Sequence, residues 1–539
     1  MSGRLAESYV FPASFAQQRM WFLCQLNPEA HRTYHMSGEF EVDGELDLEV
    51  LREALAVLVA RHEILRTRFV LFDEDDERFG GRLCQVIEPT GEIPLDETDE
   101  PFELDRLPLL RMRLSGRVLR LDAHHIICDG WSLAVFFDEL AECYRAITGG
   151  RSPDLPELPI QYADFSEWQR EQAARLDLAF WRDRLAGVPS LALPTDRPRP
   201  ERQSFRGGRV DVHLPPVLTR RVADLAAQER ATTFMVLLAA FEALLARRSG
   251  QADFAVGTPV AGRGMPEVER SIGLFVNTVV LRADIDGDPT FRELVRRVRD
   301  TSLDSFSHQD APFEQVVEQV APDRSRSLFH VFFAVQNTPA PVVDLPGARL
   351  TPRDVPRDTA MFDLRLALRP DGDAMSGWLE YNSDLFDLPT AQRIAAEWLD
   401  VVEEMLDEPD ARVEFDRADL VAAAAPVTLE RTSPEPRTQL ETELTDIFRR
   451  LLGRDELDVR TSFFEMGGTS LLAVRAMRQI RRTLRVAIPV ETIFSLTSVE
   501  KLARAIESPE SVAGTPDSEG IRDEVEAMWR NENFEEDHS

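Results

Sequence analysis

HHIICDGWS, at residues 124–132, joins two segments with different apolar periods. Before it, Leu119, Leu121 and Ala123 alternate with other residues, which predicts a β-strand with one apolar face. Successive side chains of a strand point to opposite faces, so only one of His124 and His125 can face a site if the strand geometry persists. An imidazole held at such a position suits general-base catalysis or the stabilisation of a developing negative charge.

The residues after the two histidines predict a turn followed by an amphipathic helix. Gly130 permits a sharp turn because glycine has no Cβ. Ser132 is placed to cap a helix that runs to Gly149 and Gly150. Since a lone histidine is more often structural than catalytic, the functional interpretation depends on the whole pattern.

HHxxxDG followed by Trp-Ser resembles the active-site motif of nonribosomal peptide synthetase condensation domains, which belong with the chloramphenicol-acetyltransferase-like acyltransferases. Further segments match that family in the expected order: 14–23 SFAQQRMWFL, 61–69 RHEILRTRF, 162–168 YADFSEW, 272–282 IGLFVNTVVLR, 308–314 HQDAPFE and 323–329 DRSRSLF. The last segment lacks the family's usual proline before Leu-Phe. Together the matches extend over residues 8–420.

The resemblance implies an α/β fold of two chloramphenicol-acetyltransferase-like lobes, at 1–178 and 179–420, arranged as a V with a tunnel between them. It also implies that an amine on one carrier arm attacks a thioester carbonyl on another, so that an amide forms. In that reaction His125 is the catalytic residue, while His124 supports the fold. Gly130 is expected to keep the tunnel open at the turn.

The other reactive side chains near the histidines have competing interpretations. Asp129 is either a catalytic acid–base partner or, as we prefer, half of a structural ion pair, because a buried carboxylate needs a partner. Arg282 is the preferred partner and Arg66 a weaker one. Cys128 is a weak candidate nucleophile, since apolar neighbours would keep its thiol neutral. No metal site is expected, because adjacent histidines lack the i, i+4 spacing of a helical zinc site and no HExxH occurs.

A second module follows, in which 463–472 FFEMGGTSLL resembles the motif of acyl and peptidyl carrier domains. Ser470 matches the serine that receives 4′-phosphopantetheine; the alternative is that it only caps a helix after a glycine turn. We expect a small all-α four-helix bundle at 437–508. Its first helix starts with a capping box of Thr438 and Glu441 and ends at Gly453. One apolar stripe follows this helix, formed by Leu440, Leu444, Ile447, Phe448 and Leu451.

Composition limits the classes of function. The net charge of −33 argues against nucleic acid and anionic membranes as partners. The apolar run 234–246 is too short to span a bilayer and predicts a buried helix. Four scattered cysteines without a CxxC motif predict buried thiols in a reducing cytoplasm. Lys501 is the only lysine and lies in the carrier region, and GK[ST] and GxSxG motifs are missing, so we expect neither adenylation nor a thioesterase of that type.

The resemblance also implies partners: an upstream donor carrier protein, a stand-alone adenylation enzyme, a phosphopantetheinyl transferase, and a downstream synthetase or release enzyme. A linker is expected at 421–436. The acidic tail at 509–539 carries Ile521, Val525 and Met528 or Trp529 at helical spacing. The spacing is typical of a docking peptide, whereas the charge alone favours a solubilising tail. An ester-forming or epimerising relative would also retain HHxxxDG. An inactive recruitment platform usually has a degraded histidine motif.

Overall fold

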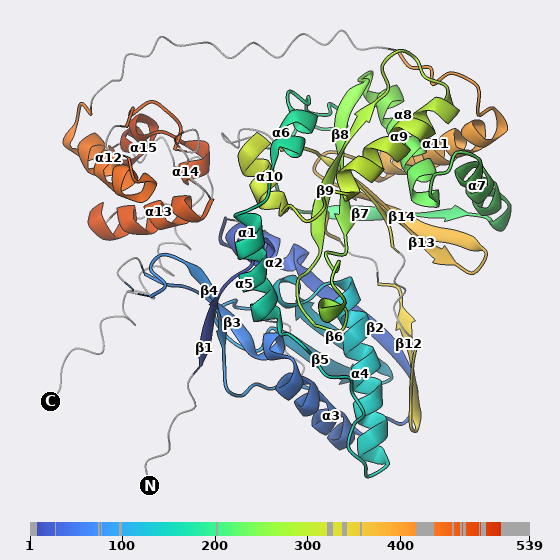
Figure 1. Ribbon diagram of the computed structural model, residues 1–539, viewed down its shortest axis with the longest axis horizontal. Helices are drawn as coiled ribbons and strands as arrows, with labels where there is room; N and C mark the ends of the chain where they lie inside the picture. Colours follow the sequence, from blue (N-terminus) through green and yellow to red (C-terminus); the bar gives the residue numbers. More distant parts are fainter. Residues whose placement is uncertain are drawn as a thin grey trace. The chain divides into compact units, whose positions relative to one another are not determined.

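The structure is a computed structural model of the whole chain, which forms two compact units, Met1–Val427 and Thr428–Ser539 (Figure 1). It describes residues 8–416 and 436–507 apart from 27, 74–75, 77, 96–99, 201–202, 321–326, 337–341, 356–357, 455–456, 464–465, 467–469, 485 and 487–491. The expected docking peptide, and the expected linker apart from its last residue, therefore lie outside the described residues.

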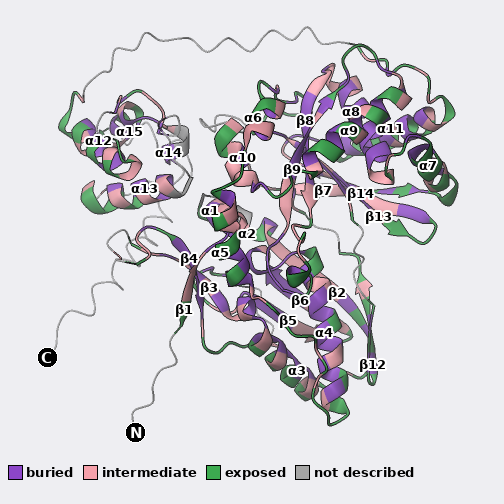
Figure 2. Cartoon of the chain, viewed as in Figure 1, coloured by how far each residue is buried: buried purple, intermediate pink, exposed green. Residues whose placement is uncertain are grey.

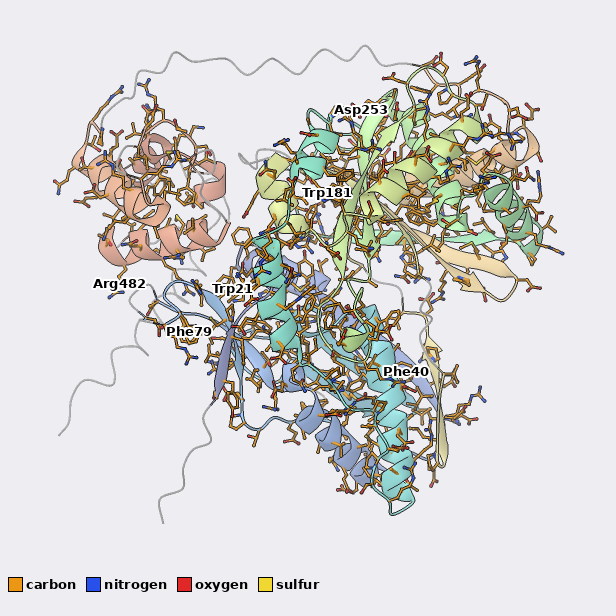
Figure 3. The ribbon with its side chains drawn as sticks, viewed as in Figure 1. Trp21, Phe40, Phe79, Trp181, Asp253 and Arg482 are labelled. Carbon is orange, nitrogen blue, oxygen red and sulfur yellow. The ribbon has the colours of Figure 1, made fainter. Side chains whose placement is uncertain are left out.

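The first lobe is built on a five-stranded sheet in the order β11-β12-β2-β6-β5, in which β11 is Val343–Leu345 and β12 is Ala348–Arg353. Strand β2 (His35–Gly44) pairs antiparallel with β6 (Val118–His124), which pairs antiparallel with β5 (Leu110–Ser115). Phe40 and Val42 of β2 are buried while Glu41 and Asp43 are exposed, which matches the alternation of apolar and acidic residues in this segment. Phe40 (labelled in Figure 3) contacts Phe137 of helix α4 with ring centroids 4.5 Å apart, so α4 packs on this sheet.

A second, smaller sheet and several helices complete the first lobe. Strands β1 (Tyr9–Pro12), β4 (Leu83–Ile87) and β3 (Thr67–Leu71) form a separate antiparallel sheet in the order β1-β4-β3. The helices are α1 (Phe15–Leu26), α2 (Pro28–Thr33), α3 (Leu48–Arg61), α4 (Gly130–Thr148) and α5 (Tyr162–Ala173), with short 3-10 turns at η1 (Glu63–Arg66) and η2 (His125–Ile127). Helix α4 ends against Gly149, as predicted.

The second lobe has a six-stranded mixed sheet. Its strands are, in spatial order, β7 (Gly207–Leu214), β14 (Ala374–Asn382), β13 (Leu364–Asp371), β10 (Val331–Val335), β8 (Asp253–Val260) and β9 (Asn277–Asp284), with β10 parallel to β8 and β13. Its helices are α6 (Ala179–Leu185), α7 (Pro216–Gln228), α8 (Thr233–Ser249), η3 (Pro266–Val268), α9 (Phe291–Phe306), α10 (Phe313–Val320) and α11 (Leu388–Asp407).

Helix α8 lies in the core of this lobe. Its residues 235–246 are all buried (Figure 2), which confirms the buried helix expected at 234–246 apart from its partly buried first residue. Among the described residues, none of the helices has both the length and the apolar character that crossing a membrane requires.

One segment of the expected second lobe joins the sheet of the first. Strands β11 (Val343–Leu345) and β12 (Ala348–Arg353) lie between β10 and β13 in sequence, yet β12 pairs antiparallel with β2 over six residue positions, from Ala348 opposite Gly44 to Arg353 opposite Glu39. This crossing was not foreseen from the sequence, because the pairing of distant strands leaves no local periodic signal. The two lobes therefore share a sheet.

The second unit contains helices α12 (Gln439–Leu452), α13 (Ser470–Leu484), α14 (Thr492–Ser495) and α15 (Val499–Glu507). The predicted apolar stripe of α12 faces its core, where Leu444, Ile447 and Phe448 are fully buried. Thr438 caps α12 as predicted, but the Glu441 carboxylate accepts from the backbone N–H of Arg437 at 2.5 Å rather than from that of Thr438. Only the Thr438 half of the predicted capping box is therefore formed.

Candidate active site

The end of strand β6 separates the two histidines. His124 is the last strand residue, and its backbone N–H donates to the Leu109 carbonyl at 2.9 Å. His125 begins the 3-10 turn η2, and its N–H donates to the Tyr34 carbonyl at 2.8 Å. His124 is fully buried, whereas His125 is partly exposed. The histidines therefore have different surroundings, although the cause is the end of the strand at His124 rather than the alternation of a continued strand.

His124 is packed in the interior of the first lobe. Its Nδ1 accepts from the Ile126 backbone N–H at 3.2 Å, which caps η2, and its Nε2 lies 3.8 Å from Sγ of Cys24. Burial, followed by the nearby His35 and His31, lowers the pKa of His124 well below its usual value. A neutral, buried ring that caps the turn carrying His125 supports the expected structural role.

His125 is held in one tautomer by a hydrogen bond to the backbone of its own turn. Its Nδ1 lies 2.7 Å from the Cys128 carbonyl oxygen. A carbonyl can only accept, so Nδ1 carries the hydrogen and donates. In the neutral ring the lone pair therefore belongs to Nε2.

Cys128 is unsuited to nucleophilic catalysis. Its side chain is buried, and its Sγ lies 3.7 Å from both the Met36 sulfur and the His124 carbonyl oxygen. Burial, and secondarily the charge of Asp129, raise the pKa of the thiol above its usual value. A thiol without thiolate character is a poor nucleophile.

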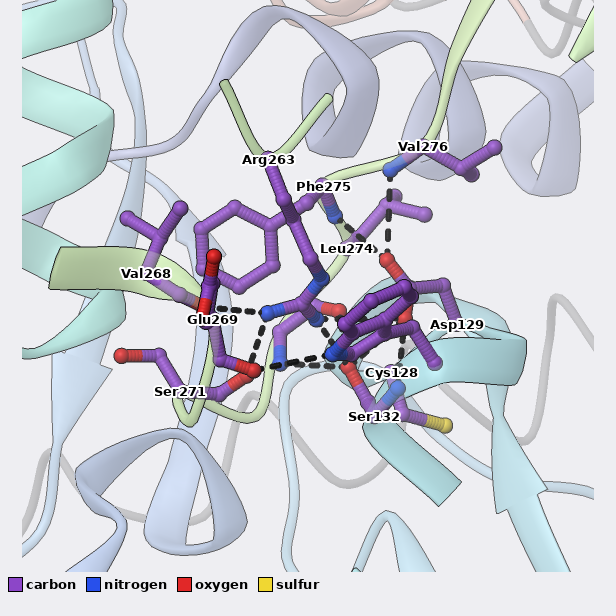
Figure 4. Close-up of polar contacts among 12 residues, drawn as sticks. Cys128, Asp129, Ser132, Arg263, Val268, Glu269, Ser271, Leu274, Phe275 and Val276 are labelled. Carbon is purple, nitrogen blue, oxygen red and sulfur yellow. Dashed lines mark hydrogen bonds and ion pairs between the residues drawn. The ribbon is translucent and has the colours of Figure 1, made fainter. Parts of the chain in front are cut away.

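Asp129 is the N-cap of helix α4, where Ser132 was expected (Figure 4). Its Oδ1 accepts from the backbone N–H and from the hydroxyl of Ser132, both at 2.8 Å. Its Oδ2 accepts from the backbone N–H groups of Phe275, at 3.0 Å, and Val276, at 3.3 Å. The helix thus begins earlier than predicted because the carboxylate, placed outside the first turn, reaches the N–H groups that a cap must satisfy.

The ion-pair partner of Asp129 is Arg263, so both expected partners were wrong. Nη2 of Arg263 lies 3.3 Å from Oδ1 of Asp129, and their side chains are 2% and 5% exposed. Arg282 instead pairs with Asp253 (labelled in Figure 3) on the neighbouring strand β8, at 2.7 Å, and Arg66 pairs with Glu63 at 3.4 Å. Arg282 thus pairs with a carboxylate on the neighbouring strand, and Arg66 pairs with one in its own 3-10 turn.

Arg263 lies in the second lobe and has several further contacts. It donates to the Ser132 hydroxyl at 2.9 Å and to the Ser271 carbonyl at 2.8 Å, and its guanidinium carbon lies 4.0 Å from the centroid of the Phe275 ring. Burial lowers the pKa of Arg263, while Asp129 opposes that shift. The sequence motifs did not indicate Arg263, because its role depends on its contact with Asp129, which is 134 residues away in the sequence.

The predicted motif at 272–282 meets the histidine motif at this point. The Ser132 hydroxyl is 2.7 Å from the Gly273 carbonyl, and the Tyr162 hydroxyl donates to the Leu274 carbonyl at 2.7 Å. Gly273 is required by close packing, since a Cβ there would lie 2.0 Å from Cδ2 of Tyr162. The structure therefore brings motifs from three parts of the sequence together at the start of helix α4.

Gly130 is the first residue of α4 and is exposed. A Cβ at this position would have no atom within 4 Å, so close packing does not explain the glycine. The expectation that Gly130 keeps space open for substrate stays a prediction.

Ser470 is the first residue of α13, although its side chain lies outside the described residues. Backbone N–H groups at a helix N-terminus favour anionic groups such as a phosphodiester. The position therefore fits attachment of 4′-phosphopantetheine.

Comparison with known proteins agrees with this geometry. The family model described as "Condensation domain" matches residues 7–420, and the one described as "Phosphopantetheine attachment site" matches 442–506. Malpinin synthetase of Mortierella alpina is 41% identical over 71% of this chain and 5% of its own length. Phosphinothricin tripeptide synthetase PhsB of Streptomyces viridochromogenes is 38% identical over 75% of this chain and 36% of its own length.

Two solved structures share the fold of the first unit. The X-domain from teicoplanin biosynthesis is 30% identical, with a TM-score of 0.65, over 75% of this chain and 96% of that domain. SgcC5 from Streptomyces globisporus is 29% identical, with a TM-score of 0.62, over 74% of this chain and all of that protein.

The fold and the histidine site define an α/β acyltransferase-type domain followed by a small helical carrier. The chain belongs to the condensation-domain family of nonribosomal peptide synthetases. Its second domain belongs to the family that carries 4′-phosphopantetheine covalently on a serine. The chain spans only a small part of the curated synthetases that it matches.

Proposed function

We propose that this chain forms an amide bond between an acyl or peptidyl donor on an upstream carrier protein and an amino acid on its own carrier domain. When attached, 4′-phosphopantetheine supplies the flexible thiol arm that presents a substrate as a thioester. The observation that carries the proposal is the 2.7 Å bond from His125 Nδ1 to the Cys128 carbonyl, because it leaves the lone pair of the neutral ring on Nε2.

The position of this lone pair favours one of the two roles considered for His125. A neutral ring with its lone pair on Nε2 accepts a hydrogen bond there and cannot donate one to a developing oxyanion. An α-amino group has a pKa of about 8, so part of it is already neutral near pH 7. His125 is therefore proposed to orient the attacking amine and accept its proton, while binding supplies the larger share of the rate by positioning.

Asp129 and Arg263 are proposed to act through structure rather than in proton transfer. Both side chains are buried, and Asp129 uses its two oxygens to cap α4 and to hold backbone N–H groups of the second lobe. This arrangement fixes the start of α4 and the turn that carries His125. Removing either residue should alter the position of His125 before it alters any proton transfer.

Variants of His125 test the proposal. His125→Ala should lower amide formation at least about 100-fold with a weakly nucleophilic amine acceptor, the usual scale for a general base. His125→Asn retains a side-chain N–H donor for the turn but has no acceptor at the Nε2 position, so it should be equally impaired. His213→Ala, at an exposed position of β7, is the matched control and should retain full activity. Unchanged turnover of His125→Ala, with folding verified, would contradict the assignment.

We further propose that Ser470 is the modified residue. Intact mass after incubation with coenzyme A and a phosphopantetheinyl transferase should rise by one phosphopantetheinyl group, and Ser470→Ala should prevent the increase. Persistence of the added mass in Ser470→Ala would place the modification elsewhere.

Loading of the carrier is proposed to occur in trans, by a stand-alone adenylation enzyme. Support comes from the lone Lys501, which lies in helix α15 of the carrier, since adenylation domains rely on a catalytic lysine in their own context. The purified chain should show no amino-acid-dependent exchange of pyrophosphate into ATP. Exchange by a preparation free of other synthetases would contradict this proposal. The product would pass to a downstream synthetase or release enzyme.

Two other functions have some support from the relatives. The structure of SgcC5 is a complex with a naphthyl ethanediol, so a hydroxyl acceptor and ester formation are the second candidate. The teicoplanin X-domain has been solved in a complex with OxyB, which suits a recruitment platform. Paired amine and alcohol acceptors in the same assay distinguish the two enzymatic reactions, and inactivity with both would favour the platform.

A further inference from the structure

A second cluster of reactive side chains lies behind the turn that carries His125. It consists of Cys24 from α1, His31 from α2, His35 from β2 and His124 from β6. The Sγ of Cys24 and one ring nitrogen each from His31 and His124 all lie within 4.8 Å of one another. The proposed reaction uses none of these side chains as an acid, base or nucleophile.

Two nitrogens of the cluster have unsatisfied hydrogen-bonding capacity. Nδ1 of His31 and Nε2 of His35 are buried, and neither has a hydrogen-bond partner among the described residues. Burying a polar atom without a partner is costly, so each of these nitrogens requires a water, an ion or another ligand that the described residues do not supply. Both atoms belong to side chains that commonly bind metal ions.

The spacing is close to that of a metal centre. Sγ of Cys24 is 3.8 Å from Nε2 of His124, and two tetrahedral ligands with bonds of about 2.3 Å (sulfur) and 2.1 Å (nitrogen) lie about 3.6 Å apart. The ring centroids of His31 and His35 are 6.0 Å and 6.1 Å from that of His124. Imidazoles sharing one tetrahedral ion would have centroids about 5 Å apart, so a small contraction closes the site.

We propose that Cys24, His31 and His124 form a binding site for a thiophilic cation, Zn²⁺ or Cu⁺, with His35 beside the fourth coordination position. On binding, the Cys24 S–H bond breaks, its proton passes to solvent, and a sulfur–metal bond forms. The proton on Nε2 of His124 moves to Nδ1, which frees Nε2 for the metal. The hydrogen bond from Ile126 to Nδ1 is lost, a small cost beside the affinity of a buried thiolate and imidazole site.

The ligands come from separate segments, so a bound ion would join α1, α2 and β6 directly behind η2. The local spacing of His124 and His125 predicted no metal. His31 and His35 are four residues apart, but α2 ends at Thr33, so the two do not share a helix face. Nothing in the sequence indicates that residues 24 and 124 lie together in space.

Cobalt provides the direct test, because a thiolate bound to Co²⁺ produces a charge-transfer band that imidazole alone does not. The full chain, stripped with a chelator under reducing conditions, should bind one equivalent of Co²⁺ with this band, and Zn²⁺ should displace it. Cys24→Ala should abolish the band, and His31→Ala should weaken binding by at least about 100-fold. Cys143→Ala, another buried thiol, and His125→Ala, in the neighbouring site, should leave the band unchanged.

Competition with a Cu⁺-selective chelator and with a Zn²⁺ indicator separates the two candidate ions. If Cys24→Ala fails to fold, X-ray absorption of the Zn²⁺-loaded wild-type chain decides the question, because the proposal requires one sulfur per metal. Absence of the cobalt band, a band that survives Cys24→Ala, or a coordination shell without sulfur would overturn the proposal. None of these results depends on whether the chain forms amides.

Discussion

Replacing Asp129 with asparagine should distinguish its structural role from an acid–base role. Within the described part of the chain, Oδ1 accepts hydrogen bonds only from the N–H and hydroxyl of Ser132 and from Arg263, and Oδ2 only from the N–H groups of Phe275 and Val276. Asparagine keeps one carbonyl oxygen and replaces the other oxygen with an NH2 donor. Whichever oxygen the NH2 group replaces, it faces N–H groups, and an N–H group cannot accept a hydrogen bond.

The expected loss of stability follows from the burial of the pair. Arg263 is 2% exposed, so removing the charge of Asp129 leaves a buried cation uncompensated. Breaking a buried ion pair in this way costs about 3–5 kcal/mol, a figure that includes the hydrogen bonds lost with the charge. Asp138 lies on α4 and forms an exposed pair with Arg270 at 3.2 Å. This pair should contribute less than about 1 kcal/mol.

Urea unfolding followed by tryptophan fluorescence measures this difference, with Asp138→Asn as the control. Asp129→Asn should lower the free energy of unfolding of the condensation domain by about 3–5 kcal/mol. Asp138→Asn should stay within about 1 kcal/mol of wild type. If Asp129→Asn is as stable as the control but has lost amide formation, the structural interpretation is wrong and the acid–base role is favoured.

Three further substitutions test other parts of the condensation domain. Gly273→Ala should cost about 1–3 kcal/mol by forcing Tyr162 aside, and Gly264→Ala, where a Cβ meets nothing within 4 Å, is its control in the same urea experiment. His124→Ala should cost about 2–4 kcal/mol by leaving a cavity, and an unchanged unfolding midpoint would argue against its structural role. Burial raises the pKa of Glu242 from 4.5 to about 8. The folded state therefore binds more protons than the unfolded state between these values, and the stability of wild type falls by up to about 1.4 kcal/mol per pH unit as the pH rises. Glu242→Gln should lack that slope, and equal slopes in urea titrations from pH 5 to about 8 would contradict the assignment.

The sequence by itself determined the elements whose information is local. Period-two alternation marked β2 and the end of β6, and the helical stripe from Leu440 to Leu451 marked α12 with its stop at Gly453. These patterns can be read because a strand or helix repeats within a few residues. The order of the motifs was enough to indicate the family. It also showed that His125 and Ser470 match the positions of that family's catalytic histidine and of the carrier serine that receives phosphopantetheine.

Only the tertiary structure decided the contacts between distant segments. Arg263 rather than Arg282 faces Asp129, β12 crosses to the sheet of β2, and Cys24 lies against His124. The hydrogen bond that puts the lone pair of His125 on Nε2 likewise depends on how η2 folds. Each of these contacts is determined by burial, charge and shape in the folded protein. Separation along the chain does not give distance in space, so from the sequence alone many arginines are equally plausible partners for Asp129, and several cysteines for His124.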